Sequence, residues 1–124
     1  MLVLDATDKS LQIVLDADVG ANALEVVVSY WSVDTANQWT PKSYESAPAT
    51  QIATTILAAP TAGAEVARVV ENVWIFNADT AATNDIVIQM LHGAVVTRVR
   101  RIDTLPINGT AVLKRDGSVA EETV

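Results

Sequence analysis

The amino-acid sequence predicts an all-β protein: an antiparallel β-sandwich, jelly-roll-like, with about eight strands. Valine, isoleucine and threonine make up about a third of the chain, and β-branched side chains suit a pleated sheet better than a helix. The apolar runs are short, and Gly, Asn, Asp and Pro separate them. This spacing favours turns between antiparallel strands over the helical crossovers of an α/β fold.

Eight segments carry the strand pattern: residues 10–15, 24–33, 51–57, 66–77, 85–92, 95–102, 110–114 and 118–123. The segment 64–73 is also open to a second interpretation. Its valines recur at helical spacing as well, so it could form an amphipathic helix; they are Val66, Val69, Val70 and Val73.

Two glycine-containing turns support the strand assignment. Asp116-Gly117 predicts a two-residue hairpin with positive φ at both central positions, and His92-Gly93 predicts a second tight connection. The strand after His92-Gly93 would expose Arg98 and Arg100 on one face. On an acidic protein these two cations could bind carboxylates of a neighbouring molecule, although an ordinary solvated face is the simpler interpretation.

The length of 124 residues predicts one domain spanning residues 1–124. Residues 1–8 are a possible N-terminal arm or edge strand, because Leu2 and Leu4 alternate with Val3 before the first aspartates. As an arm, the segment would lie on a neighbouring subunit through Leu2 and Leu4. The alternative is a first strand that closes its own sandwich.

Composition narrows the possible partners. The chain has no cysteine and a net charge of −7, which argues against thiol chemistry and against binding to nucleic acid or anionic membrane surfaces. The first 20 residues lack the basic start of a signal peptide, so we expect synthesis in the cytoplasm. A protein or a sugar is the expected partner.

No catalytic, cofactor or metal site is predicted. The one histidine, His92, has no cysteine to activate, and the chain contains neither a G-x-S-x-G motif nor a nucleotide-binding loop. Calcium is the alternative at Asp16 with Asp18, or at Asp79 with Asp85, although these residues do not follow the EF-hand pattern. The stretch 77–85 is interpreted as a turn between strands, with its Asn and Asp residues as turn formers.

Aromatic residues gather between positions 29 and 44. Trp31 has the spacing of a core residue in a strand, whereas Trp39 and Tyr44 are expected in a loop. Exposed aromatic side chains anchor protein interfaces and also stack on sugars. Trp39 and Tyr44 are therefore candidate contacts to a protein or, alternatively, to a glycan.

Two stretches carry a resemblance to a known group of proteins. The opening MLVLDATDKSLQIVL and the central VWIFNADTAATNDIVIQM resemble small virion structural proteins of tailed bacteriophages, which are β-sandwiches of similar length with an Asn-Ala-Asp-Thr junction between two strands. The resemblance spans about two-thirds of the chain. The last hairpin, from Leu113 to Val124, departs from the more aromatic hairpin of that group.

The resemblance implies a part of the virus particle without catalytic residues. We therefore expect a capsid decoration (cement) protein in the virion, made in the host bacterial cytoplasm, that binds the major capsid protein or other virion proteins. A homo-oligomer is expected, with a trimer favoured. The alternatives are a tail-fibre or receptor-binding module that recognises host surface glycan, and a neck or tail accessory protein.

Overall fold

The computed structural model describes the backbone of residues 1–123 and the side chains of residues 1–121. Ten strands form over this part of the chain: β1 (Leu2–Leu4), β2 (Lys9–Leu15), β3 (Glu25–Asp34), β4 (Trp39–Ser46), β5 (Thr54–Leu57), β6 (Glu65–Phe76), β7 (Asn84–His92), β8 (Val95–Leu105), β9 (Gly109–Lys114) and β10 (Val119–Thr123). The described chain contains no helix long and apolar enough to cross a membrane.

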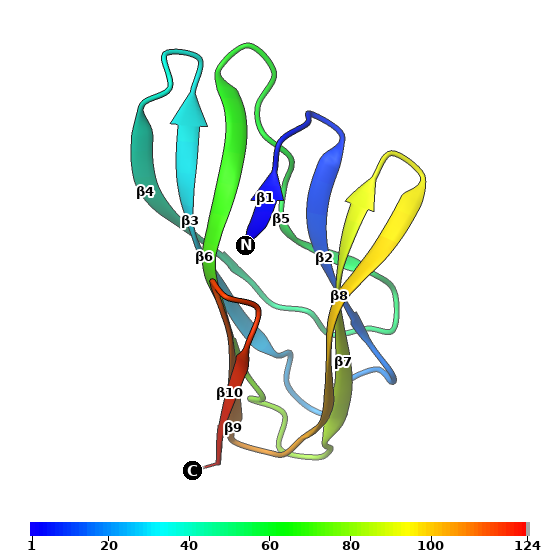
Figure 1. Ribbon diagram of the computed structural model, residues 1–124. Coiled ribbons are helices and arrows are strands. Elements are labelled where there is room, and N and C mark those ends of the chain that lie inside the picture. Colours follow the sequence, from blue (N-terminus) through cyan, green and yellow to red (C-terminus); the bar gives the residue numbers. More distant parts are fainter. Residues whose placement is uncertain (124) are drawn as a thin grey trace.

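The strands form two antiparallel sheets packed as a sandwich (Figure 1). The six-stranded sheet has the order β10-β9-β6-β3-β4, with β1 also paired to β6, and the four-stranded sheet has the order β5-β2-β7-β8. The predicted antiparallel sandwich is confirmed. Ten strands are found in place of about eight because β1 and β4 are additional strands.

Strand β6 pairs with three other strands of the six-stranded sheet. One of its edges pairs with β3, from Glu25 opposite Phe76 to Asp34 opposite Glu65. Its other edge is shared by β1, which pairs with residues 68–70, and β9, which pairs with residues 72–76. The N-terminal strand and the C-terminal hairpin therefore meet along the same edge.

The core lies between the sheets and follows strict alternation in β2, where Leu11, Ile13 and Leu15 are buried while Gln12 and Val14 are not. Alternating residues of a strand point to opposite faces, so only every second residue reaches the core. The largest fully buried side chains are Leu4, Leu11, Ile13, Leu15, Leu24, Ile56, Leu57, Ile75, Ile86, Ile88, Ile102 and Leu105.

The helical interpretation of residues 64–73 is wrong, because residues 65–73 belong to β6. The pairing with β3 shifts between Ser29 and Tyr30, which lie opposite Asn72 and Val70, so Glu71 is an extra residue in β6. A bulge of this kind places consecutive core positions three residues apart. Val70 and Val73 both face the core for this reason, and their spacing imitates a helix.

The expectation that Trp39 and Tyr44 lie in a loop is also wrong. Both belong to β4, which pairs with β3 from Val33 opposite Trp39 to Val26 opposite Ser46. Every residue of β4 except Ser46 is exposed, so the strand has no polar and apolar alternation to reveal it. Pro41 is tolerated because β4 is an edge strand.

Both predicted hairpins form. Gly93 has φ +61° in a tight turn between paired His92 and Val95. At the other hairpin only Gly117, with φ +86°, has positive φ, whereas positive φ was also expected at Asp116. The Gly117 N–H donates to the Lys114 carbonyl at 3.0 Å, so residues 115–117 form a three-residue loop that ends in a left-handed glycine.

Gly117→Val should destabilise the protein by about 1–2 kcal/mol, as measured by denaturant unfolding. A Cβ at position 117 would meet nothing within 4 Å, so the whole loss comes from the left-handed backbone. Gly117→Asn is the control, because asparagine tolerates this conformation and should lose clearly less. Equal losses in the two variants would show that the backbone conformation is not the cause.

Candidate interaction surface

The junction between β6 and β7 contains a buried carboxylate, Asp79, which is 1% exposed. Its two oxygens accept hydrogen bonds from the backbone N–H groups of Gly20 (2.8 Å), Ala21 (2.9 Å) and Ala81 (3.1 Å). These bonds, led by that of Gly20, lower the pKa of Asp79, because they favour the charged form. Asp79 therefore fixes the loop between β2 and β3 against the junction.

Asn77, fully buried in the same junction, joins three segments. Its amide nitrogen donates to the carbonyls of Leu105 (2.9 Å) and Ala82 (3.2 Å), and its side-chain oxygen accepts the Asp79 N–H at 3.1 Å. The Asn77 N–H also donates to the Gly109 carbonyl at 2.9 Å. The junction is therefore a structural hub, which agrees with its interpretation as a connection built from Asn and Asp.

The other aspartates singled out in the sequence also bind backbone amides. Asp16 accepts the Asp85 N–H at 2.9 Å, Asp18 accepts the Gln51 N–H at 2.8 Å, and Asp85 accepts the Thr104 N–H at 2.6 Å. Over the described residues, no group of three or more His, Cys, Asp or Glu side chains has the arrangement to hold a metal ion.

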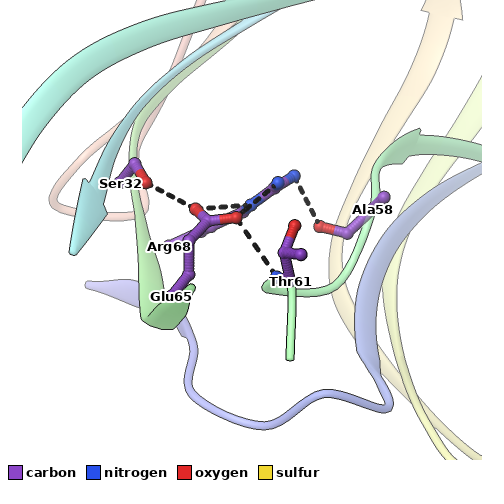
Figure 2. Close-up of polar contacts among 5 residues, drawn as sticks. All are labelled: Ser32, Ala58, Thr61, Glu65 and Arg68. Carbon is purple, nitrogen blue, oxygen red and sulfur yellow. Dashed lines mark hydrogen bonds and ion pairs between the residues drawn. The ribbon is translucent and has the colours of Figure 1, made fainter. Parts of the chain in front are cut away.

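A second polar cluster connects the start of β6 with the segment before it and with β3 (Figure 2). Arg68 donates two hydrogen bonds to Glu65 from Nε and one from Nη2, the shortest at 2.8 Å. The Ser32 hydroxyl (2.5 Å) and the Thr61 N–H (3.1 Å) also donate to Glu65. Arg68 in turn donates to the Ala58 carbonyl at 3.1 Å.

The cluster has the electrostatics of a structural ion pair. The bonds from Arg68 lower the pKa of Glu65 from 4.5 to about 2, so this carboxylate holds no proton at neutral pH. The guanidinium also lies over the ring of Tyr30, 5.2 Å from its centroid.

His92 lies elsewhere, in the β7–β8 hairpin, where its Nε2 is 3.1 Å from Asp8.

The outer face of the six-stranded sheet, which faces away from the core, carries four of the six aromatic side chains of the chain. Trp74 lies opposite Val27 and Phe76 opposite Glu25. Trp74 and Phe76 stack with ring centroids 6.0 Å apart, and Trp31 and Trp39 pack at 6.4 Å. This face, called the aromatic face below, thus holds all three tryptophans and the only phenylalanine of the chain: Trp31, Trp39, Trp74 and Phe76.

The prediction that Trp31 is a core residue is wrong. Trp31 is half-buried on the aromatic face, where its indole N–H donates to Glu71 at 3.3 Å. Val33 and Val69 share this face and are only 3% and 4% exposed, so neighbouring side chains cover them. Trp31 also borders a shallow hollow together with Pro41 and Lys42. The aromatic face is therefore apolar but not flat.

Trp39 and Tyr44 do not form one site. They are five residues apart in β4, which pairs with β3 without a register shift, so their side chains point to opposite faces. Their exposures are nearly equal, 47% and 49%. Trp39 belongs to the aromatic face, whereas Tyr44 lies opposite Val28 on the core side, at the sheet margin.

The remaining sequence-predicted contacts lie apart from the aromatic face. Leu4 is fully buried and Leu2 packs against the core, so β1 is a strand of its own sandwich in this conformation and not an arm. Arg98 and Arg100 are exposed on β8, at the edge of the other sheet. They face different sides, because the register shifts between Gln89, opposite Arg98, and Ile88, opposite Arg100.

Sequence reasoning missed Trp74 and Phe76 as surface residues. Their spacing of two along β6 was the available signal, since it places both on one face. In comparisons with protein-family models, with curated proteins and with solved structures, no match to this chain was found.

Proposed function

We propose that the protein is a non-enzymatic structural component of a tailed-phage particle, a decoration (cement) protein that stabilises the head through protein–protein contacts. The observation that carries the proposal is the aromatic face, where Trp31, Trp39, Trp74 and Phe76 gather outside the core. The resemblance of residues 1–15 and 73–90 to virion structural proteins of tailed phages directs the proposal to a virus particle.

The aromatic face has the chemistry of a protein-binding surface. Tryptophan and other aromatic residues are enriched in the centres of protein interfaces, where they contribute most of the binding energy. Trp39 is 47% exposed on this face and gives an incoming surface an apolar anchor. Binding to a shell that repeats one site many times needs only modest affinity at each site.

In this proposal the protein is made in the host cytoplasm and joins the virion by binding the major capsid protein or another virion protein. It binds no nucleic acid, in keeping with its net charge of −7, and it needs no cofactor. The aromatic face would lie against the shell. The receptor alternative would instead use exposed aromatic side chains to stack on host glycan.

The matched pair Trp39→Ser and Tyr44→Ser tests the proposal, because both side chains are about half exposed on the same strand but point to opposite faces. We expect Trp39→Ser to bind phage heads that lack the protein at least about tenfold more weakly than wild type, as an interface anchor would. Tyr44→Ser should bind within about threefold of wild type. Binding to the heads is measured by co-sedimentation.

The heat stability of phage heads provides a second measurement. Heads without the protein should release DNA at a lower temperature than complete heads. Adding back wild type, but not Trp39→Ser, should restore the release temperature of complete heads. Equal binding by wild type and Trp39→Ser would contradict the aromatic face as the contact. Particles without the protein that resist heat normally but fail to adsorb to cells would replace cementing with the receptor role.

A further inference from the structure

An apolar cavity of about 140 Å³ opens at the side of the sandwich, between the two sheets. Its apolar walls come from strands of both sheets: Leu2 on β1, Val70 on β6, Val99 on β8 and Leu113 on β9. Pockets that hold a whole small molecule have about 300–1,000 Å³, whereas an apolar cavity of about 150 Å³ holds one benzene molecule. The cavity therefore has the size for a single apolar side chain.

Both charged residues that line this cavity are cations, Lys114 and Arg115. The Arg115 side chain is 50% exposed, and its Nη1 lies 3.7 Å from Glu71, which makes a long ion pair. Its Nη2 donates to the Met1 sulfur at 3.4 Å, and Figure 1 shows the N-terminus beside the tip of the β9–β10 hairpin. A partner that carries a carboxylate next to its apolar side chain therefore suits the cavity.

The loop between β4 and β5 carries this combination. Ile52, at 76%, is the most exposed large apolar side chain in the part of the chain that the structure describes. It has fewer carbon atoms than benzene, so a cavity of this size has room for it. Asp18 lies beside the loop, because its carboxylate accepts the Gln51 N–H at 2.8 Å. Asp18 is exposed, and over the described residues it forms no ion pair.

Ile52 and the cavity lie at opposite edges of the four-stranded sheet. This sheet has the order β5-β2-β7-β8. Ile52 comes just before β5, whereas Val99 of β8 lines the cavity. Neighbouring strands are about 4.8 Å apart, so β5 and β8 are separated by roughly 14 Å. Ile52 therefore cannot fill the cavity of its own molecule, but it can reach the cavity of another copy.

We propose that Ile52 of one copy of this chain inserts into the cavity of the next copy, where Asp18 pairs with Arg115 at the mouth. The contact joins two different surfaces, so a pair of copies still has one free Ile52 and one free cavity. Further copies add in the same way until the assembly closes into a ring. The trimer expected from the sequence is one such ring. The contact needs no pairing of strands between copies.

Light scattering coupled to size-exclusion chromatography of the purified full chain tests this contact without any virus particle. We expect the mass to rise with concentration beyond that of a dimer. Ile52→Ser should weaken association more than about tenfold, because it removes the apolar anchor of the contact. Val66→Ser is the control, since Val66 is also exposed, at 48%, but lies on β6. It should associate like wild type.

A charge swap tests the mouth of the cavity in the same measurement. Asp18→Arg and Arg115→Asp should each weaken association by about threefold or more, because each change places like charges together. The combined Asp18→Arg, Arg115→Asp variant should associate more strongly than either single variant. A combined variant that associates no better than the single variants would overturn the proposal.

A spin label locates the contact. The chain has no cysteine, so Gln51→Cys gives a single attachment site beside Ile52. Mixed with isotope-labelled wild type, the spin-labelled chain should broaden the amide signals of Val99 and Gly117, which line the cavity. Broadening confined to other surfaces would overturn the proposal. A monomer at all concentrations, a dimer that does not grow, or Ile52→Ser that associates like wild type would also overturn it.

Discussion

Asn77→Ala is expected to lower the free energy of unfolding by about 3 kcal/mol or more, the largest loss we expect from a single polar residue of this protein. The change removes the partners of the Leu105 and Ala82 carbonyls and of the Asp79 N–H. Each buried polar group left without a partner costs about 1–3 kcal/mol. Chemical denaturation at neutral pH measures the loss.

Asn22→Ala is the matched control for Asn77→Ala. Asn22 lies in the facing loop, and its exposed side chain donates one long hydrogen bond, 3.3 Å, to the Ala78 carbonyl. Its removal should cost less than about 1 kcal/mol, because water replaces an exposed partner. Similar losses for the two variants would mean that the hub at Asn77 does not hold the loops together.

Arg68→Met is expected to destabilise the protein by about 2–3 kcal/mol at pH 7, because it leaves the Glu65 carboxylate without its cation. The Glu65 and Arg68 side chains are only 9% and 15% exposed, and breaking a buried pair costs more than removing both charges. The variant Glu65→Gln, Arg68→Met should therefore be more stable than Arg68→Met alone. Lys9→Met, which breaks the exposed pair with Asp5, should change stability by less than about 1 kcal/mol.

The same pair predicts a dependence of stability on pH. The pKa of Glu65 is lowered from 4.5 to about 2 in the folded protein, so the unfolded chain binds more protons between these values. The stabilisation by Glu65 is complete above pH 4.5 and is lost as the pH falls toward 2. Asp79, whose pKa is also lowered, acts in the same direction. Arg68→Met should flatten this dependence, and an unchanged acid profile would contradict the role of the pair.

The sandwich could be predicted from the sequence because β-branched runs and turn residues are local signals. The strand β2 shows this, since its alternation of Leu11, Ile13 and Leu15 matches the core positions. Strand β4 could not be found in this way. Its residues are exposed on both faces, so its conformation depends on pairing with β3, a contact that no local pattern encodes.

The bulge at Glu71 explains why the sequence pattern of β6 was ambiguous. One extra residue in β6 displaced the alternation, so Val70 and Val73 carried a helical spacing within a strand. The polar clusters could not be predicted from the sequence, because their contacts join residues that are distant along the chain. Asp79 binds the amides of Gly20 and Ala21, far away in sequence, and only the folded chain brings them together.

The candidate surface was partly visible from the sequence. Exposed aromatic character at Trp39 was expected, and its exposure of 47% agrees. The grouping with Tyr44 was wrong because five residues separate two positions on one strand, which places them on opposite faces. Trp74 and Phe76 joined the surface only once β6 was known to lie beside β3.

Cryo-electron microscopy of intact phage particles assembled with this chain tests the proposed virion role most directly. We expect density for the two-sheet sandwich on the outer surface of the head, with Trp31, Trp39 and Trp74 of the aromatic face against the shell. Heads without any such density, density confined to the tail fibres, or an aromatic face that points into solvent would contradict the proposed cementing function.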